Sequence, residues 1–134
     1  MTDQFDGLMG SGGHGEVLYQ DDKIIITEKE IVLKMYYFPF ATQRVVQLRK
    51  VKSFKVYQPR SFFKMKSWGM GVDLDVWWHC DFQRNWGDRH AVVLNTDEWP
   101  SVGLTPGSGN RENVAQVQRI LGRIVRQEET GFME

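Results

Sequence analysis

The succession of strand-like segments along this chain limits its fold more than any other feature. From Glu16 onward, short runs of β-branched and aromatic residues are separated by turn residues, a pattern typical of antiparallel β proteins. After a lead-in at 16–20, these runs predict seven strands, near residues 23–27, 31–38, 43–47, 51–57, 75–82, 89–95 and 101–104. We therefore expect a bent antiparallel sheet over residues 16–104.

One amphipathic helix is predicted to follow the strands, at residues 110–127. Asn110 is a favourable N-cap residue, and the aliphatic residues after it repeat with helical spacing. This apolar face consists of Val114, Val117, Ile120, Leu121, Ile124 and Val125. Burying these side chains would contribute roughly 9 to 18 kcal/mol before entropy, so we expect the helix to pack against the sheet.

The chain length of 134 residues fits one domain, which we place at 16–127. Residues 1–15 are rich in glycine and are interpreted as a flexible tail, and residues 128–134 as a C-terminal tail. Cys80 is the only cysteine, which fits a reducing compartment. No apolar run approaches the roughly 20 residues that span a bilayer, and the N-terminus lacks the apolar core of a signal peptide. We therefore expect a cytoplasmic protein.

The stretch DVWWHCDF at 75–82 places a histidine, a cysteine and an aspartate side by side. On a strand, successive side chains point to opposite faces, so these three groups would not converge. One face would carry Val76, Trp78, Cys80 and Phe82, all apolar, and the other Asp75, Trp77, His79 and Asp81. The pattern predicts that Trp78 and Cys80 are buried and that His79 lies on the polar surface.

No catalytic or metal-binding constellation emerges from the remaining motifs. Asp75 and His79 would be about 13 Å apart on a strand, too far to share one ion, and a surface histidine is favoured over a ligand. The chain shows no nucleophile with a base and no acid with a base. We therefore expect a protein that is not an enzyme and uses no metal or cofactor.

Charge is balanced overall but not along the chain. Seventeen basic and seventeen acidic residues give a net charge of zero and a pI near 6.8, which makes a nucleic acid an unlikely partner. Residues 31–72 nevertheless contain no acid and nine basic residues, namely Lys34, Arg44, Arg49, Lys50, Lys52, Lys55, Arg60, Lys64 and Lys66. Either these are solvent faces of strands whose acidic counterparts lie on neighbouring strands, or they form an anion-binding face.

Three tryptophans are candidates for a contact surface. Trp77 falls on the polar face of its strand, and Trp68 and Trp86 lie in or beside turns. They either cover the core locally or form a patch for a protein partner, because tryptophan is enriched at interface hot spots.

Seven strands followed by one helix is the element order of the pleckstrin-homology-like (PH-like) fold, in which the helix caps a seven-stranded bent sheet or barrel. The segments EVLYQDDKIIITEKEIVLKMYYFPF, WGMGVDLDVWWHCDFQRNWGDRHAVVLNT and VGLTPGSGNRENVAQVQRIL resemble small single-domain bacterial PH-like proteins over about residues 16–127. Their shared features are the tyrosine-rich strand before FPF, the Trp-Gly-x-Gly turn and the Thr-Pro before the helix. The linker PGSGN stands where that group has an acidic turn.

The resemblance implies a binding or assembly module and carries no catalytic signature. Family members that hold phosphoinositides use basic residues between their first two strands, whereas that loop here is Glu28-Lys29-Glu30. We therefore expect a contact with a protein partner or with the chain itself through Trp68, Trp77 and Trp86. The alternative is a peripheral anionic membrane bound through the 49–66 segment, with candidate residues Lys50, Lys52, Arg60, Lys64 and Lys66.

Overall fold

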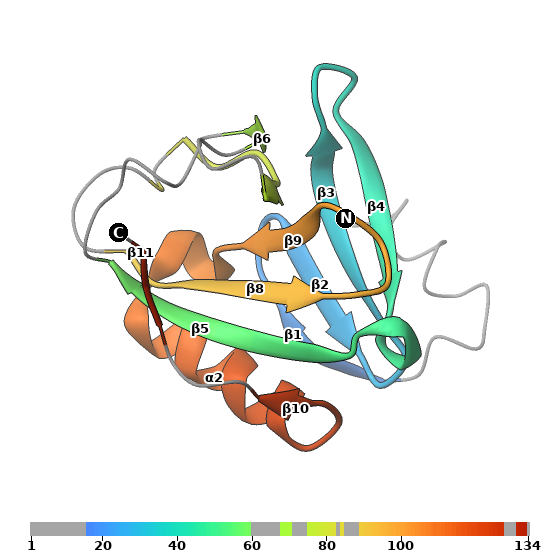
Figure 1. Cartoon of the computed structure of the whole chain (residues 1–134), viewed down its shortest axis with the longest axis vertical. Helices are drawn as coiled ribbons and strands as arrows, with labels where there is room; N and C mark the ends of the chain where they lie inside the picture. The colour runs from blue at the N-terminus through green and yellow to red at the C-terminus, as the bar shows by residue number, and fades with distance from the viewer. Residues whose placement is uncertain are drawn as a thin grey trace.

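The computed structural model describes residues 16–59, 68–70, 75–82, 84, 89–127 and 131–133. In these residues the protein is mainly β, with two sheets and one α-helix near the C-terminus (Figure 1). Trp86, Arg60, Lys64 and Lys66, and the tail at 1–15, lie outside the described residues. No helix in the described ranges is long and apolar enough to cross a bilayer.

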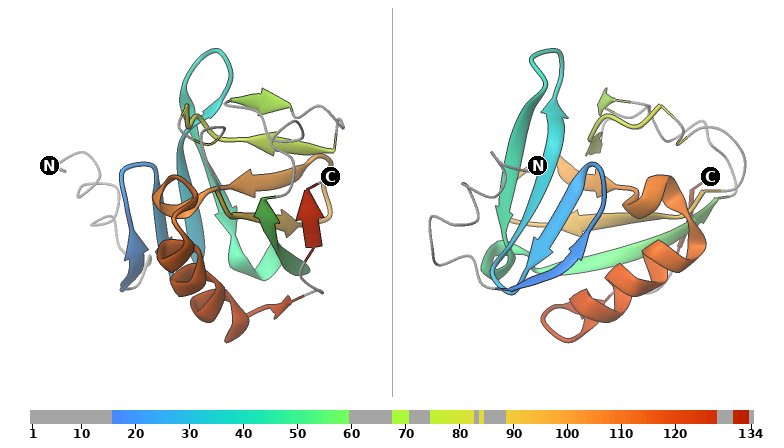
Figure 2. Two further views of the ribbon diagram at one scale, coloured as in Figure 1. Left: turned by 90° about the vertical axis from the view of Figure 1, so that its left-hand side faces the viewer. Right: turned by 180° about the vertical axis from the view of Figure 1, so that it is seen from behind.

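The first sheet is an antiparallel meander in the order β1-β2-β3-β4. Its strands are β1 (Val17–Gln20), β2 (Ile24–Thr27), β3 (Glu30–Tyr37) and β4 (Thr42–Gln47). The β3–β4 hairpin extends beyond the rest of the sheet, away from the helix (Figure 2). An irregularity in β3 between Leu33 and Tyr37 contains Met35 at a φ of 51°, and it separates the regular part of the hairpin from its tip.

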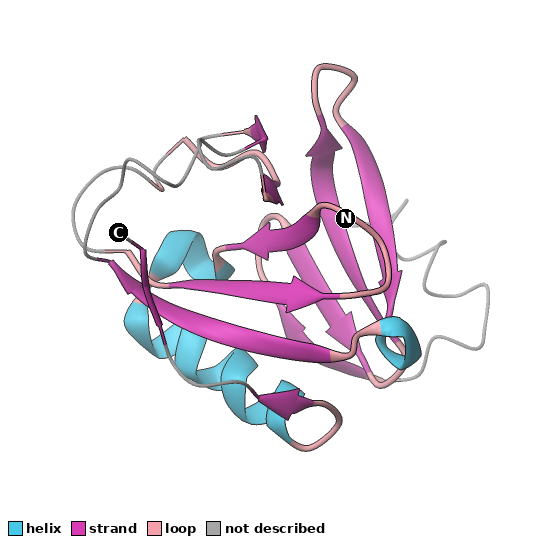
Figure 3. Cartoon of the chain, in the orientation of Figure 1, coloured by secondary structure: helices cyan, strands magenta, loops and turns pink. Residues whose placement is uncertain are grey.

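The second sheet has the order β10-β5-β8-β9-β7-β6, with β11 also pairing with β5 (Figure 3). Its strands are β5 (Ser53–Pro59), β6 (Gly69–Met70), β7 (Val76–Trp78), β8 (Ala91–Asn95), β9 (Ser101–Leu104), β10 (Arg126–Gln127) and β11 (Gly131–Met133). Strand β11 thus occupies part of the stretch that the sequence indicated as a C-terminal tail. The short 3-10 helix η1 (Leu48–Lys50) joins the two sheets.

The prediction of a purely antiparallel sheet over residues 16–104 is wrong for one pair of strands, and two further parallel pairs involve strands that were not predicted. Strands β7 and β9 are parallel, and so are β10 and β11 relative to β5. The chain reverses once between β7 and β8 and again in the β8–β9 hairpin, so two reversals leave β9 parallel to β7. The other described pairs are antiparallel.

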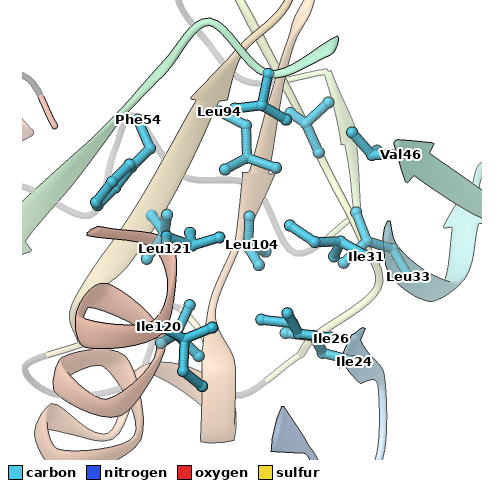
Figure 4. Close-up of a cluster of buried hydrophobic side chains, with 14 of the residues drawn as sticks. Ile24, Ile26, Ile31, Leu33, Val46, Phe54, Leu94, Leu104, Ile120 and Leu121 are labelled. Carbon is cyan, nitrogen blue, oxygen red and sulfur yellow. The ribbon is translucent and has the colours of Figure 1, made fainter. Parts of the chain in front are cut away.

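The strands form two sheets that are not closed into a barrel, whereas the sequence predicted a single seven-stranded bent sheet or barrel. Within the described residues, no strand pairing connects the first sheet to the second. The sheets instead enclose a shared core with the helix α2 (Arg111–Gly122). Figure 4 shows Leu33 and Val46 from the first sheet, Leu94 and Leu104 from the second, and Leu121 from α2 around this core.

Helix α2 begins as the sequence predicts and ends earlier. The side chain of Asn110 accepts hydrogen bonds from the N–H groups of Glu112 and Asn113 at 2.9 and 3.2 Å, which confirms the N-cap. The helix ends at Gly122, not at 127, because residues 126–127 pair with β5 as β10. Ile124 therefore lies beyond the helix and is 45% exposed, although the apolar repeat placed it in the buried face.

The segment at 75–82 is a shorter strand than predicted. Trp78 and Cys80 are buried, as the alternation indicated, but His79 and Asp81 are buried as well. Phe82, assigned to the core face, is 65% exposed. The cause is that β7 ends at Trp78, after which the chain leaves the pleat and the Cys80 N–H donates to the carbonyl of Met35 at 3.0 Å.

Candidate binding surface

The tip of the β3–β4 hairpin exposes aromatic side chains to solvent. Tyr37 is 42% exposed, Phe38 54% and Phe40 80%, and these three residues are called the aromatic hairpin below. The tip of the β3–β4 hairpin lies on the side of the molecule opposite α2 (Figures 1 and 2). Adjacent exposed aromatic side chains on a protruding element are a feature of contact surfaces.

The base of the aromatic hairpin is held by two of the tryptophans that the sequence indicated as contact candidates. The indole N–H groups of Trp68 and Trp77 both donate to the carbonyl of Tyr36, at 3.1 and 2.8 Å. The ring of Trp68 also meets that of Phe38 edge-on, with centroids 5.0 Å apart. Trp77 is half-buried against the core. The structure thus brings Trp68 and Trp77 together at the hairpin, where their polar atoms brace it.

Tyr36 connects the hairpin to the second sheet. Its ring is buried and lies edge-on to Tyr37 at 5.0 Å, with the guanidinium of Arg44 5.4 Å from its centroid. Burial raises the pKa of Tyr36 to about 12, so its hydroxyl remains protonated at neutral pH and donates to the carbonyl of Trp77 at 3.4 Å. Arg44 in turn pairs with Glu98 in the β8–β9 turn at 3.5 Å.

Strand β4 has an open edge beside this hairpin. It is the terminal strand of its sheet within the described residues. The N–H of Leu48, just after β4, donates to the carbonyl of Lys29 at 2.8 Å, and backbone groups alternate sides along an antiparallel strand. The backbone N–H and C=O groups of Gln43, Val45 and Gln47 therefore point away from β3, toward any strand placed alongside.

A groove of about 540 Å³ runs along this edge. Residues of β4 form one wall and the turn at 96–98 forms the other, with Tyr37 and Lys50 also contributing. The charges of the far wall are already paired, because Glu98 contacts Arg44 at 3.5 Å and Asp97 contacts Lys52 at 2.6 Å. The groove thus combines outward backbone groups with carboxylates that are already paired.

The basic residues that the sequence indicated are only partly gathered. Lys50 is exposed at the groove. Lys52 is also exposed, and its hydrogen bond to Asp97 raises its pKa. This contact supplies an acidic counterpart from a neighbouring turn, as the solvent-face interpretation of the basic stretch requires. The other anion-site candidates, Arg60, Lys64 and Lys66, lie outside the described residues.

A second polar group of residues lies in the interior, at the end of β7 and β9. Its members are His79, Asp81, Arg84 and Thr105, each at most 5% exposed. The Thr105 hydroxyl donates to Asp81 at 2.6 Å and accepts from Arg84 Nη2 at 3.1 Å. The guanidinium of Arg84 also lies 5.0 Å from the ring centroid of Trp78. Burial lowers the pKa of Arg84 to about 10, so the side chain keeps its charge at neutral pH.

His79 is held in this interior group as a neutral ring. Its Nε2 accepts from the N–H of Thr105 at 3.1 Å, and its Nδ1 lies 3.2 Å from the carbonyl of Cys80. Burial, and then the charges of Arg84 and Lys23, lower the pKa of His79 well below its ordinary value. Both ring nitrogens are thus engaged with backbone groups, which favours a structural role over acid–base chemistry.

A shallow pocket of about 320 Å³ adjoins this group. It is lined by Asp21, Lys23, Ser108 and neighbouring residues. Asp21 accepts from the Tyr19 hydroxyl and from the N–H of Gly107, at 2.5 and 2.7 Å. Within the described ranges, no three His, Cys, Asp or Glu side chains form a group suited to a metal ion. The polar atoms here join loops to each other, so the aromatic hairpin and the β4 edge are the stronger candidate surface.

Sequence reasoning did not single out the exposed residues of this surface. Tyr37 and Phe38 were included in a strand, and Phe40 served only as part of the FPF resemblance. A usable signal was present, because the run YYFPF places bulky aromatic residues at a hairpin turn, where few side chains can be covered. Arg84 gave no such signal, since its burial depends on Trp78 and Thr105.

Comparisons with protein-family models, with curated proteins and with solved structures find no match to this chain. Two features define the candidate surface, the aromatic hairpin and the open edge of β4.

Proposed function

We propose that this chain is a non-catalytic binding or assembly module of the PH-like type, which contacts a protein partner or a second copy of itself. The observation that carries the proposal is the open edge of β4 beside the aromatic hairpin. The edge offers backbone hydrogen bonds, and the hairpin offers exposed apolar area.

These two features suit an extended segment of a protein. A strand added to a sheet edge gains affinity from main-chain hydrogen bonds and specificity from neighbouring side chains. Tyr37, Phe38 and Phe40 supply such side chains, and their anchored base limits the entropy lost on binding. A paired edge would also remove the aggregation hazard of an unprotected strand.

The element order supports the PH-like part of the proposal. An antiparallel meander is followed by further strands and then by a C-terminal helix that packs into the core. The parallel β7–β9 pair and the separate sheets depart from the expected barrel. The PH-like assignment accordingly rests on the element order and on the packing of the C-terminal helix.

The test compares two phenylalanines that differ in position. Phe40→Ser removes the apolar tip of the hairpin, whereas Phe82→Ser removes a similarly exposed ring, at 65% against 80%, from a different part of the chain. Proteins that bind to a tagged chain are recovered, and an untagged copy of the same chain is included among the candidates. The amount recovered is compared in about 0.1 M and about 1 M salt.

We expect the wild type and Phe82→Ser to retain the same partner in both salt conditions, because desolvated aromatic area is not screened by ions. The Phe40→Ser variant should recover much less of this partner. Equal recovery by Phe40→Ser, or loss of the partner in high salt, would contradict the proposed surface.

A further inference from the structure

The outward residues of β4 are compatible with a two-fold axis. Gln43, Val45 and Gln47 lie at equal steps along the strand, with Val45 at the centre. In an antiparallel pair of two β4 strands centred there, Val45 would face Val45 of the partner subunit, and Gln43 would face Gln47 of the partner subunit. Every contact would be made twice, as in an isologous dimer.

The charges at the edge favour such a neutral strand over a charged peptide. The acidic residues of the groove, Asp97 and Glu98, are already paired with Lys52 and Arg44. The outward residues Gln43, Val45 and Gln47 carry no charge, so their direct pairs bring no like charges together. Val45 is 41% exposed and would gain an apolar contact at the axis.

The same arrangement provides a contact for the aromatic hairpin. In this pairing the start of β4 in one copy lies beside η1 of the other, so Phe40, two residues before β4, would lie near the exposed Lys50 of the partner subunit. The stem of a lysine can cover an aromatic ring, and its ammonium is attracted to the ring face. Phe40, which is 80% exposed, would thus be covered by the partner subunit.

We propose that the partner of the β4 edge is a second copy of this chain, and that the two β4 strands pair antiparallel about an axis through Val45. This inference rests on the proposed function, because it uses the same surface. It adds the identity of the partner, the strand direction and the register.

Placing a charged residue at position 45, on the proposed two-fold axis, tests this register directly. Val45→Lys places two ammonium groups opposite each other in the dimer, and Val45→Glu places two carboxylates there. Val17→Lys is the matched control, because Val17 is 40% exposed and lies in β1, the other edge strand of the same sheet. Circular dichroism and thermal melting establish that all three variants fold, and sedimentation velocity measures the monomer–dimer equilibrium.

We expect the wild type and Val17→Lys to dimerise with the same dissociation constant. Val45→Lys and Val45→Glu alone should each dimerise at least about tenfold more weakly, and a 1:1 mixture should recover the dimer. A Val45→Cys variant should also form an intermolecular disulfide, because directly paired residues place their Cα atoms within bridging distance, whereas native Cys80 is buried.

Three results would overturn the inference. They are a wild type that stays monomeric at every accessible concentration, charged variants that dimerise as the wild type does, and a mixture that fails to restore the dimer. Binding of the monomer to phosphatidylserine vesicles that is lost in Phe40→Ser would assign the hairpin to a membrane and would overturn it too.

The failure of the inference can be distinguished from failure of the proposed function. If the wild type is monomeric but still recovers a different protein in a Phe40-dependent manner, the self-pairing is contradicted and the proposed binding module is not. If the wild type is monomeric and Phe40→Ser and Phe82→Ser recover the same proteins, both the self-pairing and the proposed binding surface are contradicted.

Discussion

His79 is a residue type that is often catalytic, but in this fold it satisfies a buried backbone group. It is 1% exposed, and its Nε2 accepts the backbone N–H of Thr105, which must find an acceptor because it is buried. Protonation would place a hydrogen on Nε2 and remove this acceptor. It would also bring a second cation near Arg84, which is one cause of the lowered pKa of His79.

Stability should therefore fall on mild acidification. The unfolded chain binds a proton at His79 near its ordinary pKa of about 6.5, whereas the folded chain does not until the pH is well below that value. As the pH drops below about 6.5, the free energy of unfolding should decrease by up to about 1.4 kcal/mol per unit, until the folded pKa is reached. Urea unfolding at several pH values between neutrality and the range where carboxylates titrate measures this slope.

His79→Gln should remove most of this slope, even if it also lowers stability at neutral pH. The control is His90→Gln, which replaces a histidine that is only partly buried and should leave the slope in place. An unchanged slope in His79→Gln would show that another group causes the acid sensitivity.

At the scale of elements, α2 depends on a single capping side chain. The Asn110 Oδ1 accepts two backbone N–H groups of the first turn. Four buried residues of the helix, Val114, Val117, Ile120 and Leu121, enter the core. The cap therefore holds the start of an element that contributes to the packing of both sheets.

Asn110→Ala should lower the free energy of unfolding by about 1 kcal/mol, because it leaves these N–H groups without a side-chain acceptor. Asn110→Ser retains an acceptor oxygen and should lose less. Chemical denaturation of the three proteins measures the difference. If alanine and serine gave equal stability, the cap would not contribute in the way the hydrogen bonds indicate.

At the scale of the whole molecule, folding redistributes the charge that appears uneven along the chain. The stretch at 31–72 contains no acid, but the turn at 97–98 brings carboxylates to Arg44 and Lys52. The positive charge of this stretch is therefore partly compensated in space. With a net charge of zero, the molecule lacks a general attraction to anionic surfaces.

We accordingly expect negligible binding to phosphatidylserine vesicles at physiological salt, measured by co-sedimentation. Charge reversal of Lys64 and Lys66 to glutamate is the accompanying variant and should change nothing. Tight binding that weakens as salt shortens the screening length, and that is lost in this variant, would make the lipid alternative the primary function.

Much of the element order could be predicted from local patterns. The runs of β-branched and aromatic residues correspond to strands such as Ile24–Thr27 and Ala91–Asn95, and Asn110 correctly indicated the start of α2. These signals are local, because strand alternation and helix capping depend on residues only a few positions apart. The burial of Trp78 and Cys80 followed from the same alternation.

The candidate surface was less accessible to sequence reasoning. The pattern left open whether Trp68 and Trp77 cover the core or contact a partner. It did not show that both donate hydrogen bonds to the carbonyl of Tyr36, at separations of 32 and 41 residues. The open edge of β4 follows from the order of strands in the sheet, which no local pattern encodes. The exposed fraction of Phe40 likewise depends on how far the hairpin extends beyond its neighbours.

The sequence by itself determined the position of most strands, the start of the helix and the burial of Trp78, Cys80 and the apolar face of α2 up to Leu121. Tertiary structure alone decided that β9 pairs in parallel with β7, that β10 and β11 join β5, and that His79 and Asp81 are buried with Thr105, 26 and 24 residues away. The physical reason is that propensity and alternation act over a few residues. The pairing of strands and the satisfaction of buried polar groups depend instead on which distant surfaces meet when the core closes.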